Sequence, residues 1–183
     1  MVELDLIGED SEILHEISKE VEFPLDFNTI EEIKALEDLM IRTDPNAQGI
    51  SMVQAGILKR IAIIKYRNQS FVIINPVIKN KHGVRSSRES CLTIDNDQNS
   101  KIYYKLERPM SADVEYYSMD GKKITIKPEF KQLRVFCHEV DHMDGILIKD
   151  IGKPLKNRIG WIMMIVFVIG IIIYFFMAEY SQM

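Results

Sequence analysis

The feature that most restricts the fold is the segment PEFKQLRVFCHEVDHMDG, which begins at Pro128. Apolar residues recur in it at helical spacing, a proline suits a first helical turn, and Gly145 suits a C-terminal cap, so a helix is predicted. Within this helix His138 and His142 are four residues apart, which puts both imidazoles on one face. Glu139 stands beside the first histidine, where its carboxylate reaches a water on a metal ion held by the two rings.

A catalytic metal site commonly has three protein ligands and one open position, so the two histidines need a third partner. The candidates are a carboxylate or one of four other side chains, His15, His82, Cys91 and Cys137. Cys137 lies about 100° around the helix from His138 and is predicted to pack in the core. The other two histidines stand in polar segments and are expected to be exposed. Cys91 is favoured because a thiolate suits Zn²⁺ or Fe²⁺, and two ordinary helical histidines without a metal stay the alternative.

The rest of the charged part of the chain is predicted to hold one more helix, followed by strands. Asn28 is predicted as the N-cap of a helix over residues 29–42, with Glu31 completing a capping box. Later segments are rich in β-branched and aromatic residues, and Asp120-Gly121 is a hairpin signal. The predicted strands span 57–66, 70–79, 102–107, 112–119 and 122–127, and a polar, turn-rich stretch spans 80–100. The predicted fold class is α+β, with mostly antiparallel strands around a central motif-bearing helix.

The charge of the chain argues against nucleic acid as a partner. Lys and Arg number 23 against 27 Asp and Glu, which gives a formal net charge of −4, and the basic residues are scattered. A protein that neutralises phosphate groups needs a basic surface. No direct nucleic-acid binding is therefore predicted. The acidic N-terminus, MVELDLIGED, also lacks the apolar core of a signal peptide.

A long apolar run, IGWIMMIVFVIGIIIYFFMA, occupies residues 159–178. As a helix it would extend roughly 30 Å, the thickness of bilayer hydrocarbon. We therefore expect a single-pass membrane protein whose C-terminal transmembrane helix contacts lipid, with the preceding domain on the cytoplasmic side because basic residues flank the run there. The expected organisation is a folded domain over 1–152, a linker over 153–158, the transmembrane helix and a short tail over 179–183.

Three ordered motifs resemble those of peptide deformylases. The family patterns GxGxAAxQ, EGCLS and HExDH correspond here to AQGISMVQ (47–54), ESCLT (89–93) and HEVDH (138–142). VEFPLD and HEVDHMDGILIKD are also similar to deformylase sequence, so the resemblance covers roughly residues 10 to 152. It implies a peptide-deformylase-like fold and a metal-dependent hydrolase. The implied reaction removes the N-formyl group from the initiator methionine of nascent polypeptides and releases formate.

The resemblance also implies the metal ligands and the substrate. Cys91, His138 and His142 would bind one divalent metal ion, Fe²⁺ by preference, with Zn²⁺, Ni²⁺ or Co²⁺ as substitutes. The substrates would be N-formyl-methionyl peptides, that is, nascent chains at the ribosome.

Four further residues receive catalytic or binding roles by the same resemblance. Glu139 would accept a proton from the attacking water and pass it to the departing amine. The side chain of Gln54 and the backbone N–H of Leu92 would donate hydrogen bonds to the carbonyl oxygen as it gains charge. Gly49 would let the substrate backbone approach closely.

This sequence departs from the family patterns at residues that shape the cleft. Ala47 and Ser90 replace glycines, Ser51 and Met52 replace an alanine pair, and Thr93 replaces a serine. Every residue with an implied chemical role is retained. The departures are therefore expected to affect peptide preference more than the reaction.

Two other functions stay open at this point. A metalloprotease of the HExxH kind would take its third ligand downstream of His142, from Asp144 or Asp150. A catalytically weak, membrane-bound module that binds peptide N-termini would keep the metal as a structural element. Replacing Cys91 separates the protease from the deformylase, since only the latter would lose its metal.

Overall fold

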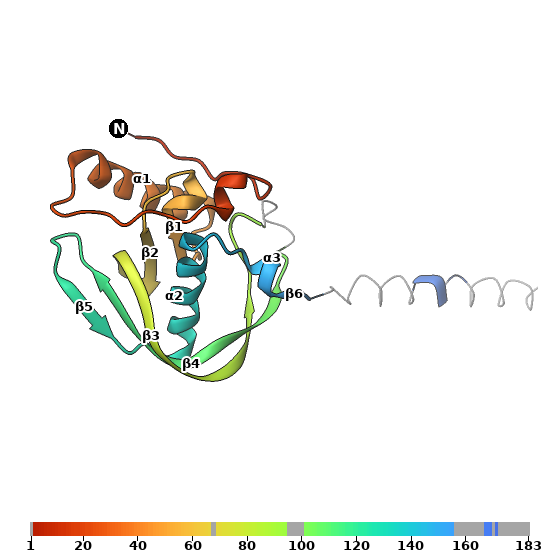
Figure 1. Cartoon of the computed structure of the whole chain (residues 1–183). Coiled ribbons are helices and arrows are strands. Elements are labelled where there is room, and N and C mark those ends of the chain that lie inside the picture. Colours follow the sequence, from red (N-terminus) through yellow and green to blue (C-terminus); the bar gives the residue numbers. More distant parts are fainter. Residues whose placement is uncertain (1, 67–68, 95–100, 156–166, 170, 172–183) are drawn as a thin grey trace, which may run out of the picture.

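The computed structural model describes residues 2–66, 69–94, 101–155, 167–169 and 171 (Figure 1). In chain order its elements are η1 (Glu12–His15), α1 (Phe27–Thr43), β1 (Gly49–Ser51), η2 (Met52–Ala55), β2 (Ile61–Tyr66), β3 (Gln69–Glu89), β4 (Tyr104–Tyr117), β5 (Lys123–Ile126), α2 (Phe130–Met143), α3 (Ile148–Ile151) and β6 (Lys153–Pro154).

Within these ranges six strands form one antiparallel sheet. The strand order is β1-β2-β3-β4-β5, and β6 pairs with β4. The sheet and the helices confirm the predicted α+β class, and β4 and β5 form a hairpin around the predicted turn at Asp120-Gly121. β6 occupies the first two residues of the predicted linker, Lys153 and Pro154.

The apolar run of β2 shows how two helices cover opposite faces of the sheet. Ile61 and Ile63 pack in one core cluster with residues of α1, whereas Ala62 and Ile64 pack in a second cluster with residues of α2. Successive side chains of a strand point to opposite faces, so a strand buried on both sides is apolar throughout. Helix α2 is therefore central, as predicted for the motif-bearing helix, and β3 and β4 curve beneath it (Figure 1).

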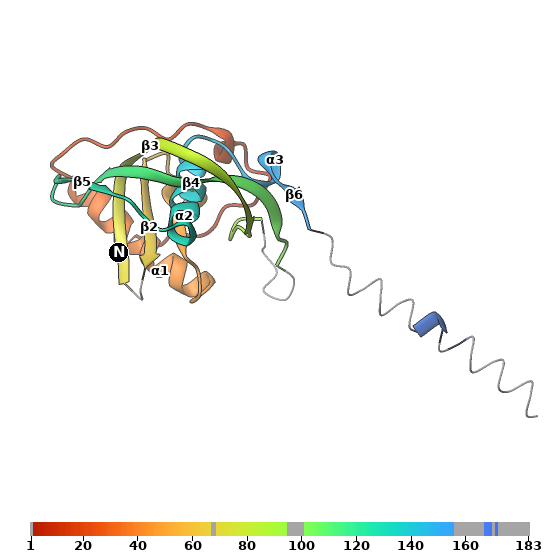
Figure 2. The ribbon, with the colours of Figure 1, turned by 90° about the horizontal axis from the view of Figure 1, so that it is seen from below.

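β3 extends further than the sequence pattern predicts. The polar residues after position 80 predict turns, but β3 continues to Glu89 and pairs with β4. Register shifts occur close to Asn75 and Asn80, whose φ angles are 50° and 49°, and the long ribbon bends (Figure 2). Residues 79–86 are all exposed, so apolar alternation is lost there while the backbone still pairs. The ribbon carries the chain to Cys91, beside α2.

The start of α1 differs from the prediction. The N-cap is Asp26, whose carboxylate accepts a hydrogen bond of 2.7 Å from the backbone N–H of Thr29. Asn28 lies inside the helix, and Glu31 accepts a hydrogen bond from Lys34 instead of completing a capping box. Asp and Asn are equally good N-caps, so composition alone did not separate these two neighbouring positions.

The end of α2 agrees with the prediction. The helix stops at Met143, and Gly145 follows in the left-handed region with φ 73°. A Cβ at this glycine would lie 2.5 Å from the backbone oxygen of His15. Gly145 is thus required both by its backbone conformation and by the close approach of the N-terminal segment.

The prediction of a single-pass membrane location is wrong, because no helix among the described residues is long and apolar enough to cross a bilayer. Most of the predicted span over 159–178 lies outside the described residues, which include only 167–169 and 171 of it, in helical conformation. The prediction rested on apolar length, whereas a span requires a continuous helix of about 20 residues. The lipid contact predicted through that span is not supported either.

Candidate metal centre and cleft

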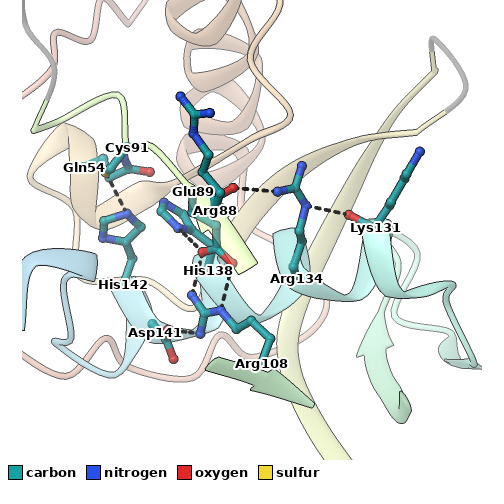
Figure 3. Close-up of polar contacts among 10 residues, drawn as sticks. All are labelled: Gln54, Arg88, Glu89, Cys91, Arg108, Lys131, Arg134, His138, Asp141 and His142. Atoms are coloured by element: carbon teal, nitrogen blue, oxygen red, sulfur yellow. Dashed lines mark hydrogen bonds and ion pairs between the residues drawn. The ribbon is translucent and has the colours of Figure 1, made fainter. Parts of the chain in front are cut away.

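Three side chains converge beside α2 in a geometry suited to a metal ion. The ligand atoms of Cys91, His138 and His142 all lie within 4.8 Å of one another. Cys91 follows the end of β3, and both histidines project from α2 (Figure 3). The Sγ atom of Cys91 is 3.2 Å from Nε2 of His142, and the two imidazole centroids are 4.9 Å apart. A buried thiol with two imidazoles is a donor set that suits Zn²⁺ or Fe²⁺.

The electrostatic surroundings favour the thiolate that a metal requires. Burial alone raises the pKa of the Cys91 thiol, but His142 and His138 hold that pKa well below its ordinary value. Burial likewise lowers the pKa of His138, but Cys91 and Glu89 raise it well above its ordinary value. The three groups are thus complementary in charge, and the residues present fit a divalent cation.

The other candidates for the third ligand lie elsewhere. His15 and His82 are exposed, as predicted. Cys137 is buried in the core with Phe136, and burial raises the pKa of its thiol to about 11. These positions confirm the sequence-based expectation for all three residues, because side-chain polarity and helix phase are local properties.

Glu139 lies in a buried position beside this cluster. Its side chain is 2% exposed, and its Oε2 atom has no hydrogen-bond partner within the described structure. Burial raises the pKa of this carboxyl to about 7, with the two histidines opposing the shift. A Cβ on Gly49 would lie 2.5 Å from Oε1 of Glu139. Gly49 therefore makes room for this carboxylate, a role that the sequence did not reveal.

Gln54 is held by both of its side-chain ends. Its Oε1 atom accepts hydrogen bonds from the backbone N–H and the hydroxyl of Ser51, at 2.9 and 3.2 Å. Its Nε2 atom donates to the hydroxyl of Thr93 at 2.9 Å and lies 3.7 Å from the sulfur of Cys91. Two residues that depart from the family patterns, Ser51 and Thr93, thus fix the amide at the edge of the metal cluster.

The other departures are accommodated without strain. Ala47 and Met52 are buried in the α1 core cluster. Neither Ala47 nor Ser90 has a positive φ; among the described non-glycine residues only Asn75 and Asn80 do. A Cβ at positions 47 and 90 is therefore compatible with the backbone.

A buried ion-pair network supports His138. Its Nδ1 atom is 3.2 Å from Oε2 of Glu89. Arg108 grips Glu89 with two hydrogen bonds, of 3.0 Å from Nε and 2.8 Å from the terminal nitrogen, and its other nitrogen bonds Asp141 (Figure 3). The side chains of Arg108 and Glu89 are 5% and 6% exposed. A carboxylate on Nδ1 fixes the ring and leaves Nε2 for a metal.

The cluster opens into a cleft of about 590 Å³. It is lined by residues 43–49, by the end of β3 and the residues that follow it, and by part of α2. Cys91, His138 and Glu139 lie in its wall, as do Gln54 and Leu92. The backbone N–H of Leu92 has no acceptor in the described part of the chain. A ligand entering the cleft would thus meet the thiol of Cys91, the ring of His138, the buried carboxylate of Glu139 and the unpaired N–H of Leu92.

Comparison with known proteins decides the family. A family model described as polypeptide deformylase matches residues 4–158. The chain belongs to this family. Peptide deformylase 2 of Clostridium acetobutylicum is 36% identical over 144 residues, which cover 78% of this chain and 90% of that protein. The peptide deformylase of Pelagibacter ubique is 32% identical over 160 residues, covering 83% and 87%.

Solved structures of deformylases share the fold. The peptide deformylase from Thermotoga maritima superposes with a TM-score of 0.75 at 25% identity, covering 84% of this chain and 100% of that chain. The enzyme from Synechococcus elongatus in complex with actinonin gives 0.73 at 26% identity, covering 82% and 79%. Peptide deformylases are metalloenzymes that remove the N-formyl group from nascent polypeptides, so the chain is a hydrolase of protein biosynthesis.

The two other functions considered from sequence are not favoured. A protease-type third ligand would come from Asp144 or Asp150, but both carboxylates are engaged elsewhere. Asp144 pairs with Arg60 at 2.6 Å, and Asp150 accepts a hydrogen bond from the backbone N–H of Leu147. The family assignment likewise favours an enzyme over a module that only binds peptide N-termini.

Sequence reasoning missed the supporting residues. Arg108 was not singled out, and Glu89 and Asp141 were noted only as parts of their motifs. Their pairing depends on the path of β3 and β4, which no local pattern encodes. The available signal was a glutamate in a predicted turn-rich stretch and an arginine just after a predicted strand, and such residues are most often exposed.

Proposed function

We propose that Cys91, His138 and His142 hold one divalent metal ion, Fe²⁺ in the native enzyme, with Zn²⁺, Ni²⁺ or Co²⁺ as substitutes, and that residues 1–152 form the catalytic domain. The observation that carries the proposal is the approach of the Cys91 sulfur to within 3.2 Å of Nε2 of His142, beside the buried carboxylate of Glu139, whose Oε2 has no hydrogen-bond partner in the described part of the chain. Three protein ligands leave a fourth position for a water. When bound, the cation supplies Lewis acidity that makes water nucleophilic near neutral pH.

Glu139 is assigned the proton transfers. It lines the same cleft as Cys91 and His138, its Oε2 has no hydrogen-bond partner among the described residues, and its pKa of about 7 suits a group that both takes and returns a proton. It accepts a proton as water adds to the formyl carbon, and it delivers that proton to the amine nitrogen as the C–N bond breaks. The products are formate and a peptide with a free methionine amine.

Gln54 and Leu92 are assigned as hydrogen-bond donors to the formyl carbonyl oxygen, which gains negative charge as water adds. The Gln54 amide is held in advance by Ser51 and Thr93, so its Nε2 is preorganised. Leu92 directly follows Cys91, and its backbone N–H donates no hydrogen bond to another described group. Gly49 serves Glu139 by leaving space for it, and the backbone there borders the cleft where the peptide lies.

The substrates proposed are N-formyl-methionyl peptides of nascent chains leaving the ribosome. The test uses the full-length chain prepared without oxygen and loaded with Fe²⁺, and it measures formate release from a formyl-methionyl tripeptide. Glu139→Gln should retain the metal and lose at least a hundredfold in kcat, whereas Cys91→Ala should lose the metal. A folded, metal-loaded wild-type protein that releases no formate would overturn the proposal.

A further inference from the structure

The wall of the cleft contains more positive charge than the metal site requires. Arg88, Lys101 and Arg134 all border it, together with His138 and Glu139. Lys101 is paired with Asp44 at 2.6 Å across the cleft lining. Arg88 and Arg134 do not share this carboxylate.

Helix periodicity places Arg134 beside the metal ligands. It precedes His138 by four residues, so both side chains leave α2 on the same face, one turn of about 5.4 Å apart. Figure 3 shows Arg134 next to Arg88, on the side of His138 away from His142. The guanidinium of Arg134 donates to the backbone oxygens of Arg88, at 2.8 Å, and Lys131, at 3.3 Å. These contacts hold the side chain in place without neutralising it.

Arg88 is held by a different contact that also leaves its charge unpaired. Its guanidinium carbon lies 3.9 Å from the ring centroid of Tyr103, another residue of the cleft. Within the described ranges neither Arg88 nor Arg134 forms an ion pair with a carboxylate. The acidic groups that line the cleft do not pair with either arginine: Asp44 pairs with Lys101, Glu89 binds Arg108 and His138, and Glu139 is buried.

We propose that Arg134 and Arg88 form an anion site in the cleft that binds a carboxylate of the peptide substrate. Arg134 is thereby a specificity-determining residue, and Arg88 supports it. Guanidinium groups that keep free N–H donors and lack a carboxylate are complementary to a carboxylate on a ligand. An extended peptide advances about 3.4 Å per residue, so carboxylates on the second or third residue come within reach of a site one helical turn from the metal ligands.

The inference rests on the proposed function for its substrate, so the experiment separates the two. Formate release is compared for formyl-Met-Ala-Asp-amide and its isostere formyl-Met-Ala-Asn-amide. A second pair, formyl-Met-Asp-Ala-amide and formyl-Met-Asn-Ala-amide, places the same change at the second residue. A formyl-Met-Ala-Asn peptide with a free C-terminus tests whether the C-terminal carboxylate of the peptide binds the two arginines instead. In one of the pairs, we expect kcat/KM to be about fivefold higher for the acidic peptide than for the neutral peptide in about 20 mM salt, mostly because KM is lower. The ratio of the two kcat/KM values should approach one in about 500 mM salt, because salt screens the charges.

Two variants distinguish binding of a carboxylate from a structural role. Arg134→Gln should abolish the preference while leaving the rate on the neutral peptide within about twofold, and Arg88→Gln should weaken the preference. Lys131→Gln is the matched control, because Lys131 is an exposed cation on the same helix that does not border the cleft. Equal losses on acidic and neutral peptides would indicate only a structural role for Arg134.

A binding measurement keeps the inference testable without turnover. The ratio of dissociation constants for the acidic and neutral formyl peptides is measured by calorimetry on the metal-loaded Glu139→Gln protein. If no peptide releases formate from the wild type, the proposed function fails, and this ratio still decides the anion site. Equal rates and equal dissociation constants for all acidic and neutral pairs would overturn the inference.

Discussion

Replacing Arg108 with methionine tests how much the buried network beneath His138 contributes. Arg108 is the one described cation that contacts both Glu89 and Asp141, and its side chain is 5% exposed. Methionine is apolar and similar in length, so the substitution removes charge and hydrogen bonds more than volume. It leaves two carboxylates at a site that water reaches poorly.

The expected size follows from the pKa of Glu89. Burial alone raises this pKa, but hydrogen bonds from His138 and Arg108 bring it from an ordinary value of 4.5 down to about 2. A difference of this size corresponds to about 3 kcal/mol of stabilisation, shared between the two partners. Unpairing Asp141 adds to the loss, and breaking a buried ion pair generally costs about 3–5 kcal/mol. We expect Arg108→Met to lower the free energy of unfolding by about 3 to 5 kcal/mol at pH 7.

The same reasoning fixes the pH dependence. A carboxyl whose folded pKa is depressed stabilises the fold above its unfolded pKa, here 4.5, and loses that contribution as the pH falls toward 2. In Arg108→Met the folded pKa of Glu89 rises, so this contribution shrinks. The difference in stability between wild type and variant should therefore be largest near neutral pH and should decrease below about pH 4.

Urea unfolding of the metal-free proteins, followed by circular dichroism at several pH values, measures both effects. Lys79→Met is the control, because it breaks the exposed pair with Glu115 and should change stability little. In metal titrations, Arg108→Met should also weaken metal affinity by about 10- to 100-fold through the loss of support for His138. A loss of stability no larger than that of Lys79→Met would show that the two carboxylates rehydrate, and the reasoning would be refuted.

Three further predictions test single contacts. Gly49→Ala would place a Cβ 2.5 Å from Oε1 of Glu139, so kcat should fall by about a hundredfold while metal content is kept, as measured by formate release and metal analysis. Asp26→Ala should lower the urea midpoint, with Asp26→Asn close to wild type, because the carboxylate caps the N–H of Thr29. That N–H lowers the pKa of Asp26, so its contribution is present above about pH 4 and is lost as the pH falls further. Divalent metal at about 1,000 times its dissociation constant should stabilise the wild type by about 4 kcal/mol in thermal unfolding, and Cys91→Ala should show no such gain.

Local patterns predicted the features whose cause lies within a few residues. The spacing of His138 and His142 placed both rings on one face, because the period of a helix depends only on its own backbone. The same holds for the stop at Gly145 and for the core position of Cys137. The hairpin at Asp120-Gly121 was equally local.

The resemblance to a family, more than any pattern, identified the partner of the two histidines. Chemistry favoured Cys91 over the other candidates but left alternatives open, since position 91 is 51 residues from His142 in the chain. The same resemblance gave the reaction, which the family comparison then confirmed. The membrane location predicted from apolar length over 159–178 was wrong, since no helix of the described residues is long and apolar enough to cross a bilayer.

Only the tertiary structure decided how the centre is supported. The path of β3 past residue 80 brings Glu89 to His138, and strand pairing brings Arg108 to Glu89. Strand register and bulges are set by pairing between distant segments, so no short stretch of sequence specifies them. Close approach is likewise a property of the packed molecule, which is why the space that Gly49 leaves for Glu139 became visible only in three dimensions.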